Sequence, residues 1–65
     1  MVELERTMDV VRLSVMRSVL SDAGIDSFVF DSAAGGLLTG AIPSRLMVRE
    51  EDLELARLAL KQAGL

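Results

Sequence analysis

The motif Leu-x-x-Ala-Gly followed by an apolar residue occurs twice in this 65-residue chain, at residues 20–25 and at residues 60–65. Each copy follows a stretch of strand-like alternation and a stretch of helical spacing. Its glycine stands where the residue after a helix needs a positive φ. Two interpretations stay open: both copies are ordinary helix ends that share one capping chemistry, or they end the two units of a split β-α-β arrangement.

Apolar spacing divides the rest of the chain into short elements. Asp9 is an N-cap candidate for the first helix, and the acidic residues 50–52 suit the positive end of the second helix dipole. Three glycines and the only proline predict a long loop. The predicted order is a strand at 2–7, a helix at 10–23, a strand at 25–31, a loop at 32–43, a strand at 44–49 and a helix from 50 to the glycine at 64.

The same spacing predicts which side chains face the core. In the first helix these are Leu13, Val15, Met16, Val19, Leu20 and Ala23, and in the second they are Leu53, Ala56, Ala59, Leu60 and Ala63. In strand 44–49, Leu46 and Val48 are predicted inward and Arg45, Met47 and Arg49 outward. In strand 2–7, Val2 and Leu4 take one side and Glu3, Glu5 and Thr7 the other, with Glu3 and Glu5 on the helix-free face. In strand 25–31, Phe28 and Phe30 share one face, and Ile25 and Val29 share the other.

Strand charges predict the order of the strands. If strand 44–49 lies in the middle, Arg45 and Arg49 face Glu3 and Glu5 of an antiparallel neighbour, and each opposite-charge pair contributes about 0.2–1 kcal/mol. We predict an α+β fold, a β-α-β-β-α ferredoxin-like plait that lacks the last strand, with a mainly antiparallel sheet and both helices on one face. A fourth strand would begin after Leu65, so strand 2–7 is expected to be an open edge that invites another chain.

Composition excludes several classes of function. The length allows one domain, residues 1–65. Absence of His and Cys removes disulfides, zinc and haem ligation, thiol nucleophiles and a histidine base. A net charge of −3 and two aromatic residues disfavour nucleic-acid binding. No stretch is long and apolar enough for a membrane span, and the acidic start is unlike a signal peptide. We expect a cytoplasmic protein without a cofactor, and 51% apolar residues indicate a partner surface.

Several further residues carry a resemblance to a known family. They are Thr7-Met8-Asp9, the two Ala-Gly motifs, Asp31, the Gly-rich segment, Ile42-Pro43-x-Arg-Leu-x-Val48, Glu50-Glu51-Asp52 and Ala56. Together they resemble the bacterial domain of unknown function 2007, a family described as signal-transducing proteins, over about residues 2–65. The resemblance implies a PII-like, ferredoxin-like fold. In PII proteins the loop in the place of 32–43 contacts partner proteins and helps enclose a nucleotide. Here that loop lacks Lys, Arg and Tyr, so no nucleotide-binding residues are carried over.

The Gly-rich loop is the first candidate site. Gly35, Gly36, Leu37, Leu38 and Gly40 form its most unusual stretch. Glycines let backbone N–H groups approach an anion, but no phosphate-loop spacing is present. A plain hairpin excursion, a partner-contact loop using the leucines together with Ile42, and a ligand loop stay open as interpretations.

Arginines and leucines outside the predicted core are further candidates. Arg12 lies near the centre of the apolar arc, where it either reaches solvent or an acid, or binds an anion together with Arg45. Leu55 and Leu58 lie off the core stripe and are either single exposed leucines or a contact surface. Consecutive acids at 50–52 do not converge on one ion, which favours capping over a metal site. Asp31 beside Ser32 is predicted to form a turn.

These patterns favour a non-enzymatic regulatory module that self-associates or binds another protein. The contact would use the 32–43 loop, the edge of strand 2–7, or Leu55 and Leu58. The alternative is a sensor that binds a small anionic metabolite or nucleotide near Arg12, Arg45 and the glycine loop. An enzyme is disfavoured because the only acid–base candidates are exposed carboxylates.

Overall fold

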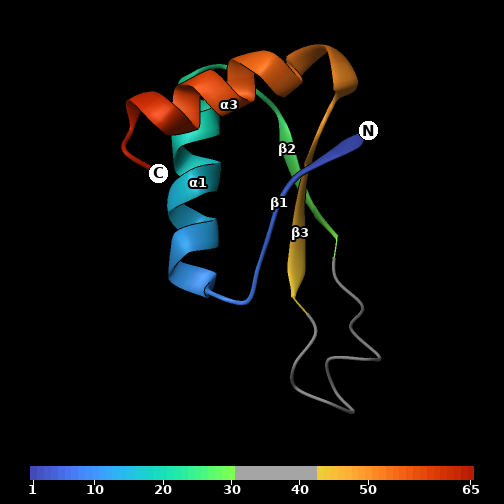
Figure 1. The fold of residues 1–65 in the computed structure, drawn as a ribbon, viewed down its shortest axis with the longest axis vertical. Coiled ribbons are helices and arrows are strands. Elements are labelled where there is room, and N and C mark those ends of the chain that lie inside the picture. The colour runs from blue at the N-terminus through green and yellow to red at the C-terminus, as the bar shows by residue number, and fades with distance from the viewer. Residues whose placement is uncertain (31–42) are drawn as a thin grey trace.

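One antiparallel sheet organises the chain (Figure 1). The structure, a computed structural model, describes residues 1–30 and 43–65, and over these residues three strands pair in the order β1-β3-β2. The strands are β1 (Val2–Thr7), β2 (Ser27–Phe30) and β3 (Ser44–Val48). Because β3 is antiparallel to both neighbours, the third strand lies between the first and the second, as the sequence predicts.

Helices cover one face of this sheet. Within the described residues, α1 spans Val10–Asp22 and α3 spans Leu53–Gln62, and the 3-10 turn η1 (Glu50–Asp52) leads into α3. Figure 1 shows that α1 lies alongside the strands and that α3 crosses the C-terminal end of α1. This arrangement confirms the α+β prediction and is compatible with a ferredoxin-like plait.

Several boundaries differ from the predicted ones. β3 ends at Val48 instead of residue 49, and α3 ends at Gln62, before the glycine at 64. The second strand begins at Ser27, because the residues before it still belong to the cap of α1. The first helix ends at Asp22, with Ala23 as its C-cap. The acidic residues 50–52 form the tighter η1 turn instead of the first turn of an α-helix. Asp31, the predicted end of the second strand, lies outside the described residues.

Helix α1 ends in a Schellman motif. Gly24 has a φ of 76° and donates its N–H to the carbonyl of Ser21 at 3.0 Å. The N–H of Ile25 donates to the carbonyl of Leu20 at 2.9 Å, and both side chains are buried in the core. These two hydrogen bonds and the apolar contact define the motif, so the leucine, the glycine and the final apolar residue of the repeated motif each have a structural role.

Helix α3 ends in the same way. Gly64 has a φ of 79° and donates to Lys61, while Leu65 donates to Leu60 at 2.9 Å. The repeat is therefore a shared capping motif. The strand order also matches the split β-α-β arrangement, so the two interpretations of the repeat hold together.

The core lies between the sheet and the helices. Met16, Leu20, Leu46 and Val48 are fully buried, and Leu13, Ile25, Ala56 and Leu60 complete the buried set. The predicted inward positions Val15, Ala23 and Ala63 are wrong, since all three are exposed. The two alanines stand at the helix ends, and short strands cover only a narrow stripe of α1, which leaves Val15 at its margin.

A β-bulge in β1 changes the faces of its side chains. Glu3 lies opposite Met47, but Glu5 already lies opposite Leu46, so β1 carries one extra residue at this point. A bulge shifts the alternation of every residue after it. Glu5 therefore shares the helix-covered face with the buried Leu46, and its predicted position on the outer face is wrong.

The predicted cross-strand ion pairs are wrong for the same reason. After the bulge, Arg45 lies opposite Arg6 and not opposite an acid. The side chain of Glu3 accepts from Arg6 of its own strand at 2.9 Å. Arg49 instead pairs with Asp26 at 2.6 Å. The order of the strands was thus predicted correctly from charge pairs that do not form.

Candidate functional site

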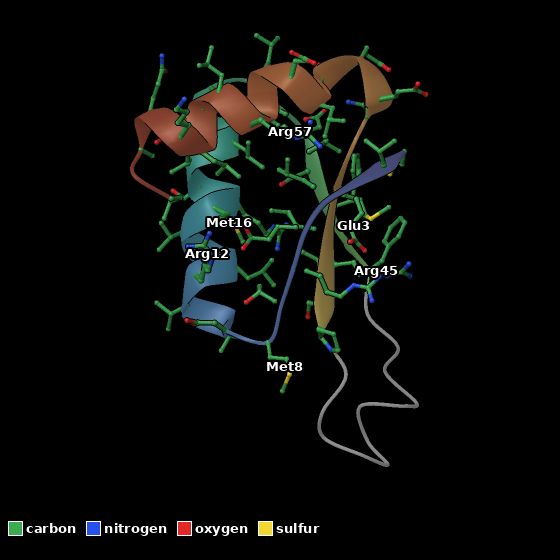
Figure 2. All side chains as sticks on the ribbon, viewed as in Figure 1. Glu3, Met8, Arg12, Met16, Arg45 and Arg57 are labelled. Carbon is green, nitrogen blue, oxygen red and sulfur yellow. The ribbon has the colours of Figure 1, made fainter. Side chains whose placement is uncertain are left out.

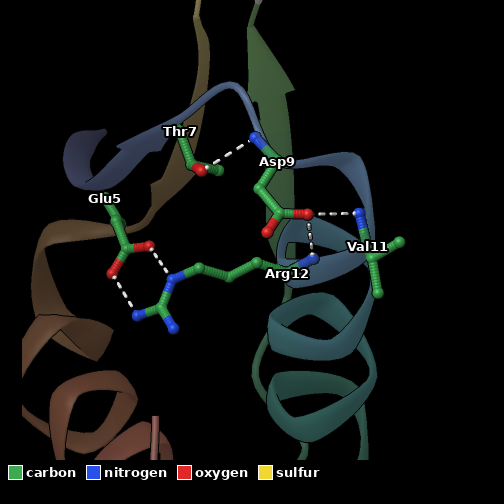
Figure 3. A network of polar contacts seen from close by, with 5 residues as sticks. All are labelled: Glu5, Thr7, Asp9, Val11 and Arg12. Atoms are coloured by element: carbon green, nitrogen blue, oxygen red, sulfur yellow. Dashed lines mark hydrogen bonds and ion pairs between the residues drawn. The ribbon is translucent and has the colours of Figure 1, made fainter.

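Arg12 and Glu5 form an ion pair between α1 and β1 (Figure 3). The guanidinium donates from Nε to Glu5 Oε2 at 2.7 Å and from Nη2 to Oε1 at 3.0 Å. Both side chains are about one third exposed, at 37% and 30%. This two-bond geometry is the strongest form of an arginine–carboxylate contact. The interpretation that Arg12 reaches an acid is confirmed, and its hydrogen-bonding groups already face a partner within the fold.

Asp9 places Arg12 by capping α1. Its Oδ1 accepts from the backbone N–H groups of Val11 and Arg12, each at 3.0 Å (Figure 3). The Thr7 Oγ1 in turn accepts from the Asp9 N–H at 3.0 Å. The N-cap predicted at Asp9 is confirmed. The cap sets the start of α1, and with it the turn from which Arg12 reaches Glu5.

The ion pair also sets the acidity of Glu5. Its hydrogen bond to Arg12 holds the pKa of the Glu5 carboxyl below its ordinary value of 4.5, and the charge of Arg12 adds to this effect against the opposing effect of burial. A carboxyl with a lowered pKa in the folded state contributes stability above its unfolded pKa. That contribution is lost as the pH falls from about 4.5 through the lower folded value.

We therefore expect Glu5→Gln to lower the free energy of unfolding at pH 7 and to have little effect at an acidic pH below the folded-state pKa of Glu5, where the carboxyl is protonated in both states. Urea unfolding at the two pH values measures this difference. Glu54→Gln, at an exposed position on α3, removes the same charge without this contact and is the control. An equal loss for Glu5→Gln at both pH values would contradict the assignment.

Arg45 lies on the other side of the sheet from Arg12 (Figure 2). Its strand neighbour Leu46 is buried under the helices, so Arg45 points to the face that no described element covers. The structure therefore does not bring the two arginines of the predicted anion site together. We call the helix-free surface the open sheet face; its members are Glu3, Arg6, Phe28, Phe30, Arg45 and Met47.

Phe28 and Phe30 share a face, as the sequence predicts, and the structure places that face on the helix-free side of the sheet. The guanidinium of Arg49 stands over the ring of Phe28 at 5.5 Å from the centroid, and the same group is held by Asp26. That carboxylate raises the pKa of Arg49 by hydrogen bonding and charge. Phe30 lies two residues further along β2 and is 41% exposed. Residues 26 and 49 are far apart in sequence, and nothing in either neighbourhood signals their contact.

The leucines predicted to lie off the core stripe are exposed. Leu55 is 59% exposed and Leu58 is 50% exposed. Residues three apart on a helix are neighbours on its surface. The two side chains therefore form one apolar patch on the outer side of α3, which we call the α3 leucine pair.

Comparison with known proteins places the chain in a family. Residues 1–64 match the family model of the domain of unknown function 2007, described as "Putative prokaryotic signal transducing protein". The chain belongs to the DUF2007 family. No curated protein and no solved structure matches this DUF2007 chain. The resemblance inferred from the sequence motifs is confirmed.

The edge of the DUF2007 sheet at β1 has features that oppose pairing with another strand. β1 carries the bulge and three charged residues in its six positions. Bulges and charges are devices by which native edge strands avoid further pairing. Of the contact surfaces predicted from the sequence, the edge of β1 is thus less favourable than the α3 leucine pair. The third surface, the 32–43 loop with Gly35, Gly36, Leu37, Leu38 and Gly40, lies outside the described residues apart from Pro43.

A polar groove of about 330 Å³ lies between α1 and the start of β2. Its lining consists of Arg17, Ser18, Ser21, Ile25, Asp26 and Ser27. The groove offers hydroxyl groups and one guanidinium, and its carboxylate is already paired with Arg49.

Residues 1–30 and 43–65 contain neither a cluster of metal-ligating side chains nor a helix that could span a membrane. In this part of the chain, no three metal-ligating side chains come together. The acids at 50–52 occupy the η1 turn before α3. Asp52, the N-cap of α3, makes no side-chain capping hydrogen bond, so the predicted capping is wrong, although the acids do lie at the positive end of the helix dipole. Neither helix described here has the length and apolar character that crossing a membrane requires.

Proposed function

We propose that this DUF2007 chain is a non-enzymatic signal-transducing module that acts by protein contact in the bacterial cytoplasm. The family description and the fold support a regulatory role, and the PII-like resemblance of the motifs agrees with it. The observation that carries the proposal is the α3 leucine pair. Each of the two leucines is at least half exposed, and covering their apolar surface with a partner would be favourable in free energy.

A second copy of the chain is the partner that the charges of α3 favour. The helix begins with Glu54 in its first turn, after the acidic η1 turn, and carries Lys61 in its last turn. When two α3 helices pair antiparallel, the acidic end of each faces the basic end of the other. The leucine pairs then meet near the two-fold axis, where the apolar centre of an interface lies.

Concentration-dependent self-association is therefore expected, and sedimentation velocity over a range of concentrations measures it. The double variant Leu55→Glu/Leu58→Glu should raise the dissociation constant at least about tenfold, because each leucine contributes on the order of 1 kcal/mol or more at a buried interface. Val11→Glu is the matched control, since Val11 is 70% exposed on the other helix. A wild-type chain that stays monomeric, or a double variant that associates as tightly as the wild type, would overturn self-association through α3.

The alternative function, sensing of a small anionic ligand, draws support from Arg45 and not from Arg12. Arg12 is held by Glu5, whereas Arg45 stands on the open sheet face beside Arg6. A sensor built on this chain would therefore use the open sheet face.

A further inference from the structure

Two arginines face each other on the open sheet face. Arg6 of β1 lies directly opposite Arg45 of β3, and Phe30 of β2 lies opposite Arg45 on its other side. Neighbouring strands are about 4.8 Å apart, so the three side chains form one row across the whole sheet. Figure 2 shows Arg45 at the side of the sheet that faces away from α1.

This row has an unbalanced positive charge. Like charges directly opposite each other on neighbouring strands are destabilising. Glu3 neutralises only Arg6, through a contact in which the two side chains are 55% and 38% exposed. Over the residues that the structure describes, no carboxylate lies within ion-pair distance of Arg45. Arg6 and Arg45 thus stand at paired positions of neighbouring strands, and together with Glu3 they leave one positive charge that a bound anion would balance.

The chemistry of the row selects the anion. Guanidinium groups bind phosphate through paired, directional hydrogen bonds. A phosphate monoester has three terminal oxygens that accept hydrogen bonds, so it can be shared between two guanidinium groups more readily than a carboxylate, which has two. Phe30 is 41% exposed next to Arg45 and offers a surface for an aromatic group.

We propose that Arg6, Arg45 and Phe30 form a binding site for a small phosphate monoester that carries an aromatic ring. The phosphate lies between the two guanidinium groups, and the ring of the ligand stacks on Phe30. Glu3 competes with the phosphate for Arg6, so it lowers the affinity. The site is independent of the α3 leucine pair, which belongs to the helical layer.

Amide NMR titration of the full chain with phenyl phosphate tests the site. Saturable shifts are expected at residues 6, 30 and 45, with weaker binding of inorganic phosphate and of phenol, each of which lacks one half of the ligand. Arg45→Gln should weaken binding about tenfold or more, as expected for the loss of a charged hydrogen-bonding group. Glu3→Gln should strengthen it, because Arg6 then has no competing carboxylate. Arg57→Gln on α3 changes the net charge equally and should leave binding unchanged (Figure 2).

Stability without ligand separates this role from a structural one. Because Arg45 faces Arg6, Arg45→Gln should not lower the melting temperature, whereas a structural arginine would lower it on removal. The proposal is overturned if phenyl phosphate causes no shifts at residues 6, 30 and 45. It is also overturned if Arg45→Gln and Arg57→Gln weaken binding equally, which would indicate an effect of net charge alone. Leu55→Glu/Leu58→Glu should bind phenyl phosphate normally, so failure of self-association leaves this test intact.

Discussion

Replacing Leu46 with Ala is expected to lower the free energy of unfolding by about 2–5 kcal/mol. Leu46 is fully buried in the central strand, where it lies opposite residues of both edge strands. Its side chain therefore packs in the hydrophobic core between the sheet and the helices. Truncation leaves a cavity there that the neighbouring strands can fill only in part. A domain of this length has about 3–10 kcal/mol of stability in total, so a large fraction of the variant should be unfolded. Urea unfolding followed by circular dichroism measures the loss.

Leu58→Ala is the matched control for this prediction. The substitution is identical, but Leu58 is 50% exposed on α3. A surface substitution of this kind is expected to change the stability by about 0.5 kcal/mol or less, measured at a protein concentration where the chain is monomeric. Similar losses for the two variants would show that Leu46 does not lie in the core.

The second large effect is expected at the two capping glycines. Gly24 and Gly64 have φ values of 76° and 79°, a region that costs a residue with a Cβ roughly 1–2 kcal/mol. A Cβ added at either position meets no atom within 4 Å, so the cost comes from the backbone alone and should be similar at both sites. Gly24→Ala combined with Gly64→Ala should therefore lose about 2–4 kcal/mol, because distant sites add.

Asparagine provides the control at the same positions. It enters the left-handed region more readily than alanine does, so Gly24→Asn should lose less stability than Gly24→Ala. Thermal and urea unfolding of the single and double variants measure these differences. If alanine were neutral at Gly24, or if asparagine cost more than alanine there, the Schellman motif would not be the reason for the repeated glycine.

Features that depend on a few neighbouring residues were predicted well from the sequence. The cap at Asp9 and the C-terminal motifs with Gly24 and Gly64 form through contacts within six residues of chain. A short motif of consecutive residues is therefore enough to predict each of them. The burial of Leu46 and Val48 follows from simple alternation in a regular strand. The exposure of the α3 leucine pair follows from helical spacing alone. Among the candidate contact surfaces, the sequence could therefore locate this one.

Features that depend on partners distant in sequence were missed. The pair of Arg49 with Asp26 joins residues that lie 23 positions apart in the sequence. Alternation also fails wherever a strand is irregular, as it does in β1. One extra residue there moves Glu5 to the helix-covered side and places Arg6 opposite Arg45. The anion site predicted at Arg12 and Arg45 fails for a different reason: Arg45 alternates with the buried Leu46 and therefore lies on the sheet face away from α1.

The sequence by itself determined the types of the elements, the caps at Asp9, Gly24 and Gly64, and the family of this chain, because each of these depends on local periodicity or on motifs of consecutive residues. The strand order was predicted correctly, but from charge pairs that do not form. Only the tertiary structure decided which charged groups meet. Whether a bulge in β1 is stable depends on how β1 pairs with β3. No local pattern in the sequence of β1 encodes that pairing. The contact of Glu5 with Arg12, and the row of Arg6, Arg45 and Phe30 on the open sheet face, both result from that pairing.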